Sequence, residues 1–576
     1  MASTVSLFTG LSGLATNSRR MEVIGNNVSN INTPSFKSNR MFFQPTFSRS
    51  FSLGTSPSTA SGGTNPGQIG LGSTLAGTQR NFSNGAISTT GVNTDLAIEG
   101  DGFFVVNRGT EQYYTRAGAF QFNAENDLVT LTGDRLQGYG VDSNFNIVRG
   151  QLVDVNIPIG TLTLAEPTQN VVFSGNLKAN GERATQGTTL TFGATGIVDG
   201  TTLLTAIGAG ALAVDDVITL SGAQRGDKAL PDATYTVTAG SSMQDFADFL
   251  MDSIGIVVDG GYQAGDPTGA PEPGGSTYAA DLMTLVGNWG TANDIDLSGT
   301  NITVRDMTGA AKANPFAITK TAQANGESVR TTFVVHDTLG TPLEVDVTMV
   351  LATANNNGTF WRAFLHSAAD TDQGLHLEAG LHTVPTTGPV PLIQFDNFGR
   401  LLSSPTISME LDRDATGATP ALAVNLAFSS NGDSVTSLSD SANRASTLAA
   451  VFEDGARLGT LNSFSVGVDG VITGGFTNGL TRNIGQLALA AFTNPEGLVD
   501  IGNNLFQVGP NSGTALITEP LELGTGKVLG GALELSNVDL SEEFTGMILT
   551  STGYSAASRI ITTTDEMLQQ LLLIGR

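Results

Sequence analysis

The sequence predicts a mainly β, multidomain subunit whose N- and C-terminal α-helices form an axial coiled coil. Residues 4–31 and 540–574 carry apolar or small side chains in a four-three alternation, which is the spacing of a coiled-coil seam. The sequence between them is rich in Gly, Thr, Ser, Asn and Val, and it contains short alternating runs that indicate strands. The chain has 576 residues, too many for one hydrophobic core, so we expect about three to five domains.

Each terminal helix carries a row of seam positions. The N-terminal seam comprises Leu7, Leu11, Leu14, Ser18, Met21, Gly25 and Val28. The C-terminal seam comprises Leu540, Phe544, Met547, Ser551, Tyr554, Ser558, Ile561, Leu568 and Leu572. Helices at opposite ends of a β-rich chain can pair with each other or with further copies of the chain. The pattern therefore favours a polymer subunit over an enzyme, and an intramolecular helical hairpin that closes one domain is the alternative.

The two ends also carry opposite charge. Residues 1–50 hold five basic residues and one acidic residue, whereas residues 531–576 hold six acidic and two basic residues. Ends of opposite sign can attract each other within one subunit or between neighbours. The alternative is that both charged ends are solvent-exposed surfaces that do not contact each other.

We expect the domains to be nested in sequence. The chain would start at the axial helices, run outward through successive domains and return through the same domains to the second helix. The N-terminal axial helix, residues 1–40, would form an inner core domain with the C-terminal axial helix, residues 537–576. Residues 41–78 are rich in Ser, Gly, Thr and Pro and predict a linker or long loop. The other predicted boundaries are a discontinuous β domain at 79–155 and 440–536, a second discontinuous β domain at 156–185 and 326–439, and one α/β-like inserted outermost domain at 186–325.

Two local motifs predict single elements of these domains. The runs 96–98 and 103–106 are apolar and flank Gly100-Asp101-Gly102, which predicts a β-hairpin. In the inserted domain, residues 242–245 read Ser-Met-Gln-Asp and resemble a capping box. The helix that follows would bury Phe246, Phe249 and Leu250.

The composition argues against several kinds of protein. Cysteine is absent, so the chain has neither disulfides nor thiolate chemistry. The net charge of −26 disfavours nucleic acid as a partner, because phosphate binding needs clustered Lys and Arg. No apolar run reaches the roughly 18 residues that span a bilayer, and the N-terminus lacks the features of a cleavable secretion signal. We therefore expect no membrane insertion and, if the protein is exported, export without signal cleavage.

Catalytic and metal-binding motifs are not evident in the sequence. The histidines are His336, His366, His376 and His382, and none has a partner four residues away that suits a metal. We expect no catalytic residue, no cofactor and no metal site.

The end of the N-terminal helix carries a specific motif. Residues 25–37 read Gly-Asn-Asn-Val-Ser-Asn-Ile-Asn-Thr-Pro-Ser-Phe-Lys. This run resembles the signature of the bacterial flagellar rod and hook proteins, in which an Asn-rich helix end runs into a Thr-x-Gly-Phe-Lys turn. The matching residues are Asn26, Asn27, Asn30, Thr33, Phe36 and Lys37. The sequence departs from the family pattern at Ser35, where glycine is usual.

The C-terminal part resembles the same family. Residues 485–498 are similar to its returning strand, residues 536–544 to the opening of its last helix, and residues 562–568 to the close of that helix. Asn537 and Asp539 lie in this opening, where Asn, Asp and Ser side chains can also cap the helix. The resemblance therefore covers two terminal blocks in the expected order.

Within this family the middle of the chain distinguishes two kinds of subunit. Rod proteins add little between the terminal blocks, whereas hook subunits carry extra outward domains. Residues 333–342 and 395–401 resemble the second domain of hook subunits. The resemblance implies a structural hook subunit that self-assembles into a flexible tube and transmits torque as a universal joint. A distal rod protein with an insertion and, from a different class, a secreted β-rich adhesin or hydrolase are the alternatives.

The resemblance also implies partners and a location. The expected partners are further copies of the chain in a helical homopolymer, a rod protein at the proximal end, a hook-filament junction protein at the distal end, a hook cap during assembly and the flagellar type III export apparatus. The implied location is the extracellular flagellum, attached to the basal body.

Overall fold

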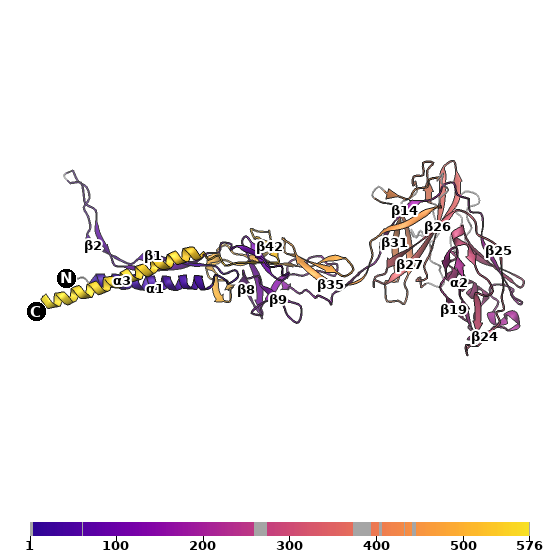
Figure 1. The fold of residues 1–576 in the computed structure, drawn as a ribbon, viewed down its shortest axis with the longest axis horizontal. Helices are drawn as coiled ribbons and strands as arrows, with labels where there is room; N and C mark the ends of the chain where they lie inside the picture. Colours follow the sequence, from indigo (N-terminus) through magenta and orange to yellow (C-terminus); the bar gives the residue numbers. More distant parts are fainter. Residues whose placement is uncertain are drawn as a thin grey trace. The chain divides into compact units, whose positions relative to one another are not determined.

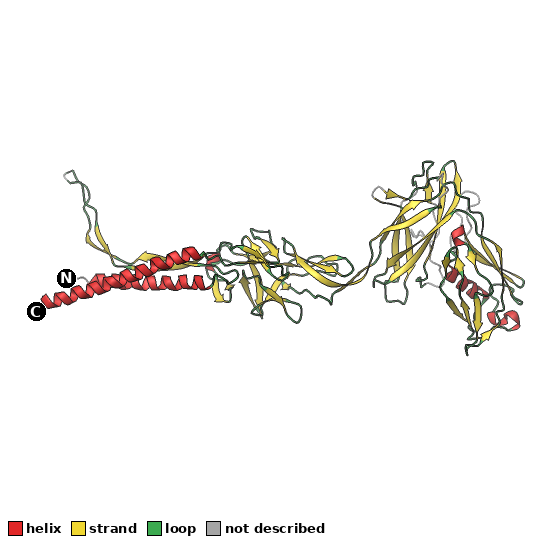
Figure 2. Ribbon diagram, viewed as in Figure 1, coloured by secondary structure: helices red, strands yellow, loops and turns green. Residues whose placement is uncertain are grey.

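The computed structural model describes residues 4–59, 61–257, 274–371, 393–402, 406–430, 433–439 and 445–574. The chain divides into two compact units: unit 1 comprises Met1–Thr163 and Thr460–Arg576, and unit 2 comprises Leu164–Gly459. Unit 1 is discontinuous in sequence because the chain returns to it. Both units consist mainly of β-strands, and the two long helices belong to unit 1 (Figure 2).

Two helices, α1 (Thr4–Ser29) and α3 (Leu540–Ile574), run side by side in unit 1 (Figure 1). Small residues line their contact. A Cβ atom added at Gly10 would lie 2.9 Å from Cγ1 of Ile561, and one added at Gly13 would lie 3.5 Å from Cβ of Ala557. Glycine lets the two backbones approach closely, since interhelical distance depends on the side chains at the contact. The expected fold class, mainly β with paired terminal helices, is confirmed.

Residues 39–80 contain regular structure, so the expectation of a linker or long loop at 41–78 was wrong. The strands are β1 (Asn39–Pro45), β2 (Ser48–Ser52), β3 (Gly67–Gly70) and β4 (Ser73–Arg80). β1 pairs antiparallel with β4, and β2 with β3. β1 and β4 lie along α1, where Oγ1 of Thr16 is 3.3 Å from Oγ of Ser73. These strand pairs are held by backbone hydrogen bonds and hydroxyl contacts. A composition rich in Ser, Gly and Thr does not predict such pairing.

Strands from both halves of unit 1 form its β domain. The first half contributes β5 (Ile87–Thr89), β6 (Leu96–Glu99), β7 (Phe103–Arg108), β8 (Glu111–Thr115), β9 (Phe120–Phe122), β10 (Leu128–Thr130), β11 (Arg135–Tyr139) and β12 (Val153–Asp154). The second half contributes β35 (Ala456–Val466), β36 (Val471–Phe476), β37 (Thr481–Leu487), β38 (Leu489–Ala491), β39 (Val499–Gly502), β40 (Leu505–Gln507), β41 (Leu516–Thr518), β42 (Lys527–Gly530) and β43 (Ala532–Glu534). One antiparallel path runs β35-β36-β37-β11-β7-β8-β40-β39, so strands distant in sequence become neighbours.

The predicted hairpin around Gly100-Asp101-Gly102 was wrong. β6 pairs with β42, whereas β7 pairs with β8, β11 and β38. The runs 96–98 and 103–106 are both apolar and buried, and each lies against its own partner strands. Gly100 has a φ of +117°, and a Cβ atom added there would lie 2.7 Å from Cα of Gly526. The turn therefore packs against a second backbone segment instead of joining two paired strands.

Unit 2 contains a β-sandwich. Its strands are β14 (Asn170–Asn176), β26 (Ser328–His336), β27 (Pro342–Asn355), β28 (Gly358–His366), β29 (Ile393–Phe395), β30 (Thr406–Asp412), β31 (Ala421–Ala427) and β34 (Thr447–Glu453). They form two sheets with the orders β26-β27-β28-β29 and β30-β31-β14-β34, which share one apolar core around Trp361 and Phe173. We had assigned residues 440–536 to the inner β domain, but β34 pairs with β14 and lies in unit 2. The domain boundary there was placed too early, because β34 pairs across a long sequence separation.

Residues 186–325 form a second part of unit 2 with its own apolar cluster. Its elements are β15 (Gly187–Gly193), η1 (Leu204–Ala209), β16 (Val217–Leu220), β17 (Gln224–Arg225), β18 (Lys228–Ala229), β19 (Ala233–Thr236), α2 (Met243–Ile254), β20 (Gly275–Ala279), β21 (Leu282–Trp289), η2 (Thr291–Asn293), β22 (Ile295–Asp296), β23 (Ile302–Arg305), β24 (Ala311–Lys312) and β25 (Ala317–Ala322). The predicted capping box is confirmed, since Ser242 and Asp245 exchange side-chain-to-backbone hydrogen bonds at the start of α2. The division of the chain into finer domains stays a prediction.

The crowding at Gly100 predicts a stability difference. Gly100→Ala should lower the free energy of unfolding by about 3 kcal/mol, because the new Cβ atom meets backbone and the positive φ is strained. Gly91 is the matched control: its φ is +72°, but no atom lies within 4 Å of an added Cβ. Gly91→Ala should therefore cost only about 1 kcal/mol. Urea unfolding of the two variants measures this difference, and equal losses would contradict the close packing at Gly100.

Candidate functional site

None of the predicted seam residues of α1 and α3 is fully buried in the subunit. The fully buried positions on the two helices that face the partner helix include Gly10, Ile24 and Asn27 on α1 and Ala557 and Thr564 on α3. Seam positions such as Leu11 and Tyr554 are rotated away from this line, since one residue turns a helix by about 100°. Ile561 is an exception, because its side chain packs on Gly10.

The seam residues lie partly or fully exposed on the helix pair. Leu7, Leu14, Met21, Val28, Met547, Ile561 and Leu568 are half-buried. Leu11, Leu540, Phe544, Tyr554 and Leu572 are exposed, with 58% of Leu11 and 75% of Leu572 accessible. Other large apolar side chains of the pair are exposed as well, namely Phe8, Ile548, Leu549, Ile560, Met567 and Leu573. The pair thus holds small residues inside and presents large apolar residues outside.

Asn27 of the predicted signature ties the two helices together. Its Nδ2 donates to Oε1 of Glu543 over 2.7 Å and to the carbonyl oxygen of Asn39 over 2.8 Å. Its Oδ1 accepts from the backbone N–H of Asn39 over 3.0 Å. Burial raises the pKa of Glu543, and the hydrogen bond from Asn27 and the charge of Arg20 oppose this rise. One buried amide therefore joins the start of α3, the end of α1 and the start of β1.

Lys37 forms a buried ion pair with Glu534 of β43. Nζ of Lys37 lies 2.7 Å from Oε1 of Glu534, and the two side chains are 1% and 0% exposed. Nζ also donates to the carbonyl oxygen of Ser83 over 2.8 Å, and the N–H of Gly85 donates to Oε1 of Glu534 over 2.8 Å. Burial lowers the pKa of Lys37, whereas the charge and hydrogen bond of Glu534 act to raise it. The carboxylate thus compensates part of the cost of burying a cation without water.

Arg116 completes this buried cluster. Its Nη1 lies 3.9 Å from Oε2 of Glu534 and donates to Oδ1 of Asn84 over 3.3 Å. Burial lowers the pKa of Arg116, and the charges of Glu534 and Asp101 oppose the shift. Sequence reasoning missed Glu534 and Arg116. A carboxylate within the apolar run 531–535 was the signal available for Glu534.

The remaining signature residues shape the turn between α1 and β1. Nδ2 of Asn30 donates to the carbonyl oxygen of Asn26 over 2.9 Å, and Oγ1 of Thr33 donates to Oδ1 of Asn30 over 3.1 Å. The N–H of Phe36 donates to the carbonyl oxygen of Thr33 over 3.2 Å. Ser35 has a φ of +56°, in the left-handed region that favours glycine. The usual glycine of the family pattern therefore has a conformational reason, and the serine adopts the same kind of turn.

Asn537 and Asp539 act at the start of α3. Oδ1 of Asp539 accepts from the N–H groups of Ser541 and Glu542 over 2.8 and 3.2 Å, which caps the helix. Asn537 instead bridges to other segments: its Oδ1 accepts from the N–H of Ser38 over 2.8 Å, and its Nδ2 donates to the carbonyl oxygen of Asn81 over 2.8 Å. The structure therefore brings Asn27, Lys37, Asn537 and Asp539 into one region, which we name the helix–sheet junction.

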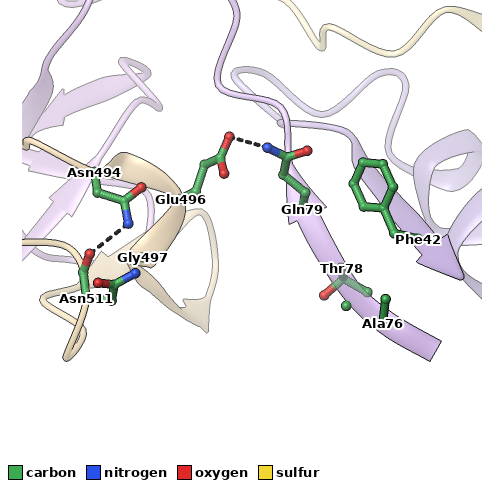
Figure 3. Close-up of a pocket in the computed structure, with 9 residues that line it drawn as sticks. Phe42, Ala76, Thr78, Gln79, Asn494, Glu496, Gly497 and Asn511 are labelled. Carbon is green, nitrogen blue, oxygen red and sulfur yellow. Dashed lines mark hydrogen bonds between the residues drawn. The ribbon is translucent and has the colours of Figure 1, made fainter. Parts of the chain in front are cut away.

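An open hollow of about 480 Å³ lies between β4 and the 494–511 segment (Figure 3). Nε2 of Gln79 donates to Oε1 of Glu496 over 2.6 Å, and Nδ2 of Asn494 donates to the carbonyl oxygen of Asn511 over 2.7 Å. These polar groups are bonded to one another, and the aromatic ring of Phe42 stands apart from them. The hollow offers no nucleophile–base arrangement of the kind that acyl transfer needs.

The described residues contain no group of three or more His, Asp or Glu side chains that could hold a metal ion. His336 lies on β26 and His366 on β28, whereas His376 and His382 lie outside the described residues. Among the helices of the described part of the chain, none combines the length and apolar character of a membrane span.

The buried pair at the helix–sheet junction predicts a large mutational effect. Lys37→Met should lower the free energy of unfolding by about 3–5 kcal/mol, because it leaves Glu534 without its nearest cation. Lys527→Met is the matched control: Lys527 pairs with Glu99 over 3.0 Å, but both side chains are more than 40% exposed. That change should cost about 0–1 kcal/mol. Denaturant unfolding distinguishes the two, and a loss at Lys37 as small as at Lys527 would refute the junction's role.

Three family profiles match the chain in sequence order. They are "Flagella basal body rod protein" at residues 7–37, "Flagellar hook protein FlgE/F/G D1 domain" at residues 97–198 and "Flagellar basal body rod FlgEFG protein C-terminal" at residues 529–573. The first and third include the residues of the helix–sheet junction that come from α1 and α3.

Relatives match over different shares of the chain. The flagellar hook protein FlgE of Treponema pallidum is 29% identical over 99% of this chain and 99% of its own length. The flagellar basal-body rod protein FlgG of Bacillus subtilis is 45% identical, but over 20% of this chain and 44% of its own length. The crystal structure of Helicobacter pylori flagellar hook protein FlgE2 aligns with a TM-score of 0.36 and 17% identity, over 77% of this chain and 98% of that one. The full-length match is to a hook protein, and the chain belongs to the flagellar rod and hook protein family as a structural, non-enzymatic subunit of the hook.

Proposed function

We propose that copies of this chain polymerise into a tubular hook through the outer faces of their α1–α3 helix pairs. The observation that carries this proposal is the row of large apolar side chains that the pair leaves exposed, including Leu11, Phe544 and Leu572. Large apolar side chains that gather on an exposed element mark interaction sites. Neighbouring helix pairs supply a surface of the same composition to cover it.

The energetics of the helix pair support assembly over isolation. Several fully buried positions of the helix pair are glycine, threonine or alanine, which contribute little apolar area, and Ile24 is the large apolar side chain among them. Each Leu or Phe side chain buried by a neighbour would contribute about 1.5–3 kcal/mol, before the costs of association. A few such side chains per subunit would therefore contribute substantially to a polymer contact.

The hook would work as a flexible universal joint that transmits torque from the rod to the filament. In this proposal, the axial helices carry the torque and the β domains farther along the chain adjust their contacts as the tube bends. The low charged fraction of 14% suits many weak, exchangeable contacts between neighbours. The nested arrangement with 186–325 as the outermost domain belongs to this proposal.

The ends of the polymer need other partners. We assign a rod protein to the proximal end, a hook-filament junction protein to the distal end and a hook cap to the growing tip, on the basis of family membership. Export would proceed through the flagellar type III apparatus. The absence of cysteine supports passage through a route that requires an unfolded, uncrosslinked chain.

The proposal predicts that Leu11→Asp abolishes polymerisation and leaves the subunit folded. Leu11 is exposed in the single subunit, so the carboxylate costs nothing there, whereas in the polymer it would be buried without a partner. Ser555→Asp on the polar, exposed face of α3 is the matched control and should polymerise normally. Sedimentation and negative-stain microscopy detect the tubes, and circular dichroism checks the fold.

Ile561→Asp should fail in a different way. Ile561 packs on Gly10, so its replacement would disturb the helix pair itself as well as assembly.

Tubes of normal length from Leu11→Asp would show that this face of the helices is not the axial contact.

A further inference from the structure

Segment 186–325 joins the β-sandwich of unit 2 through a narrow neck. The backbone N–H groups of Thr185 and Gln186 donate to Oδ1 of Asn325 over 2.9 and 3.1 Å, so the entering and leaving strands touch. Gly326 has a φ of +101°, and a Cβ atom added there would lie 2.4 Å from Cα of Ala184. Two strands alone would leave the segment free to pivot, because domain motion is the default unless a further interface prevents it.

A second contact, formed by charged residues, lies away from the neck in sequence. Nη2 of Arg225 on β17 lies 3.1 Å from Oδ2 of Asp346 on β27, and Nζ of Lys228 on β18 lies 2.8 Å from the same oxygen. The side chains of Arg225 and Asp346 are each 4% exposed. One carboxylate of the sandwich is thus held by two cations of the segment.

Neighbouring groups from both sides fix this ion pair in place. Oγ1 of Thr332 donates to Oδ1 of Asp346 over 2.6 Å, and Nη1 of Arg225 donates to the carbonyl oxygen of Gly255 over 2.7 Å. Nη1 of Arg330, on the sandwich strand β26, donates to the carbonyl oxygen of Arg225 over 2.7 Å. Arg225 therefore contacts the end of α2 and two strands of the sandwich at once.

His366 closes the space beside Arg225 without adding charge. Its Nε2 lies 3.2 Å from the carbonyl oxygen of Asp252 near the end of α2. Burial, followed by the charge of Arg225, lowers the pKa of His366 to about 4, so the ring is neutral at neutral pH. Gly255 has no room for a side chain, since a Cβ atom there would lie 2.2 Å from Nη1 of Arg225 and 2.7 Å from the His366 ring.

We propose that Arg225, Lys228 and Asp346 form an electrostatic latch that holds segment 186–325 in one orientation on the β26–β29 sheet. Opening the latch would leave Asp346 without either cation and expose the buried guanidinium of Arg225, both of which oppose rotation about the neck. A small apolar cluster that includes Val257, Val350 and Phe364 adds contact but no directional preference. The two parts of unit 2 then move as a single body.

Distance measurements on the full-length chain test the latch. Because the chain lacks cysteine, Thr234→Cys in the segment and Ala423→Cys in the sandwich provide two exposed sites for nitroxide labels. Pulsed electron paramagnetic resonance should give one narrow distance distribution for this labelled protein. Adding Arg225→Met and Lys228→Met should broaden it, with the open population rising on the order of a hundredfold, as expected for loss of a buried pair.

A matched double variant controls for lost charge. Lys320 pairs with Asp294 inside the segment, and Arg305 is exposed and donates to the carbonyl oxygen of Gly309. Lys320→Met with Arg305→Met removes the same two positive charges and should leave the distribution narrow. Equal broadening in this control would overturn the proposal.

Asp346→Asn removes the acidic partner of the latch instead of its two cations. The amide keeps the shape of the carboxylate, so the sandwich should fold even where the double methionine variant does not. The proposal expects broadening from Asp346→Asn, and little further broadening when Arg225→Met is added to it. A narrow distribution in Asp346→Asn would show that the neck and the apolar contact suffice, and would refute the latch.

Discussion

The buried ion pair between Lys37 and Glu534 fixes how the helix pair of unit 1 joins its β domain. The two residues are 497 positions apart in sequence, and neither has access to water. A charge in such a place is stable only with its partner, so the turn after α1 and the strand before α3 must meet there. The same junction brings the end of α1 to the start of α3, where Asn27 donates to Glu543.

The helix pair places its residues in the reverse of the usual order for a coiled coil. Gly10, Ala557 and Thr564 are fully buried, whereas the large apolar side chains Leu11, Phe544 and Leu572 are exposed. This arrangement gives a close internal approach with little apolar gain, and it leaves most of the apolar area for a second surface. In the proposed polymer, neighbouring subunits would cover this apolar surface and add to the stability of the helix pair.

The sequence predicted local elements well, but it did not identify strand partners that are distant in sequence. The helix at 540–574 and the capping box of α2 depend on local spacing, and both were correct. Seam positions such as Leu11 and contact positions such as Gly10 share one period, so spacing could not tell which row faces the partner helix. The pairing of β6 with β42 and the burial of Glu534 join segments that sequence spacing does not relate.

The few charges of this chain gather where distant segments meet. Only 14% of its residues are charged, yet buried cations occur at the helix–sheet junction, at Arg225 against Asp346 and at Arg413 against Asp337. Apolar burial is non-directional, so it favours a compact chain without specifying which segments pair. A buried charge is stable only beside a segment that supplies its counter-ion. In a chain of short strands rich in glycine, serine and threonine, many pairings have similar energies. The buried pairs select among them, because a wrong pairing would leave an ion without both water and partner.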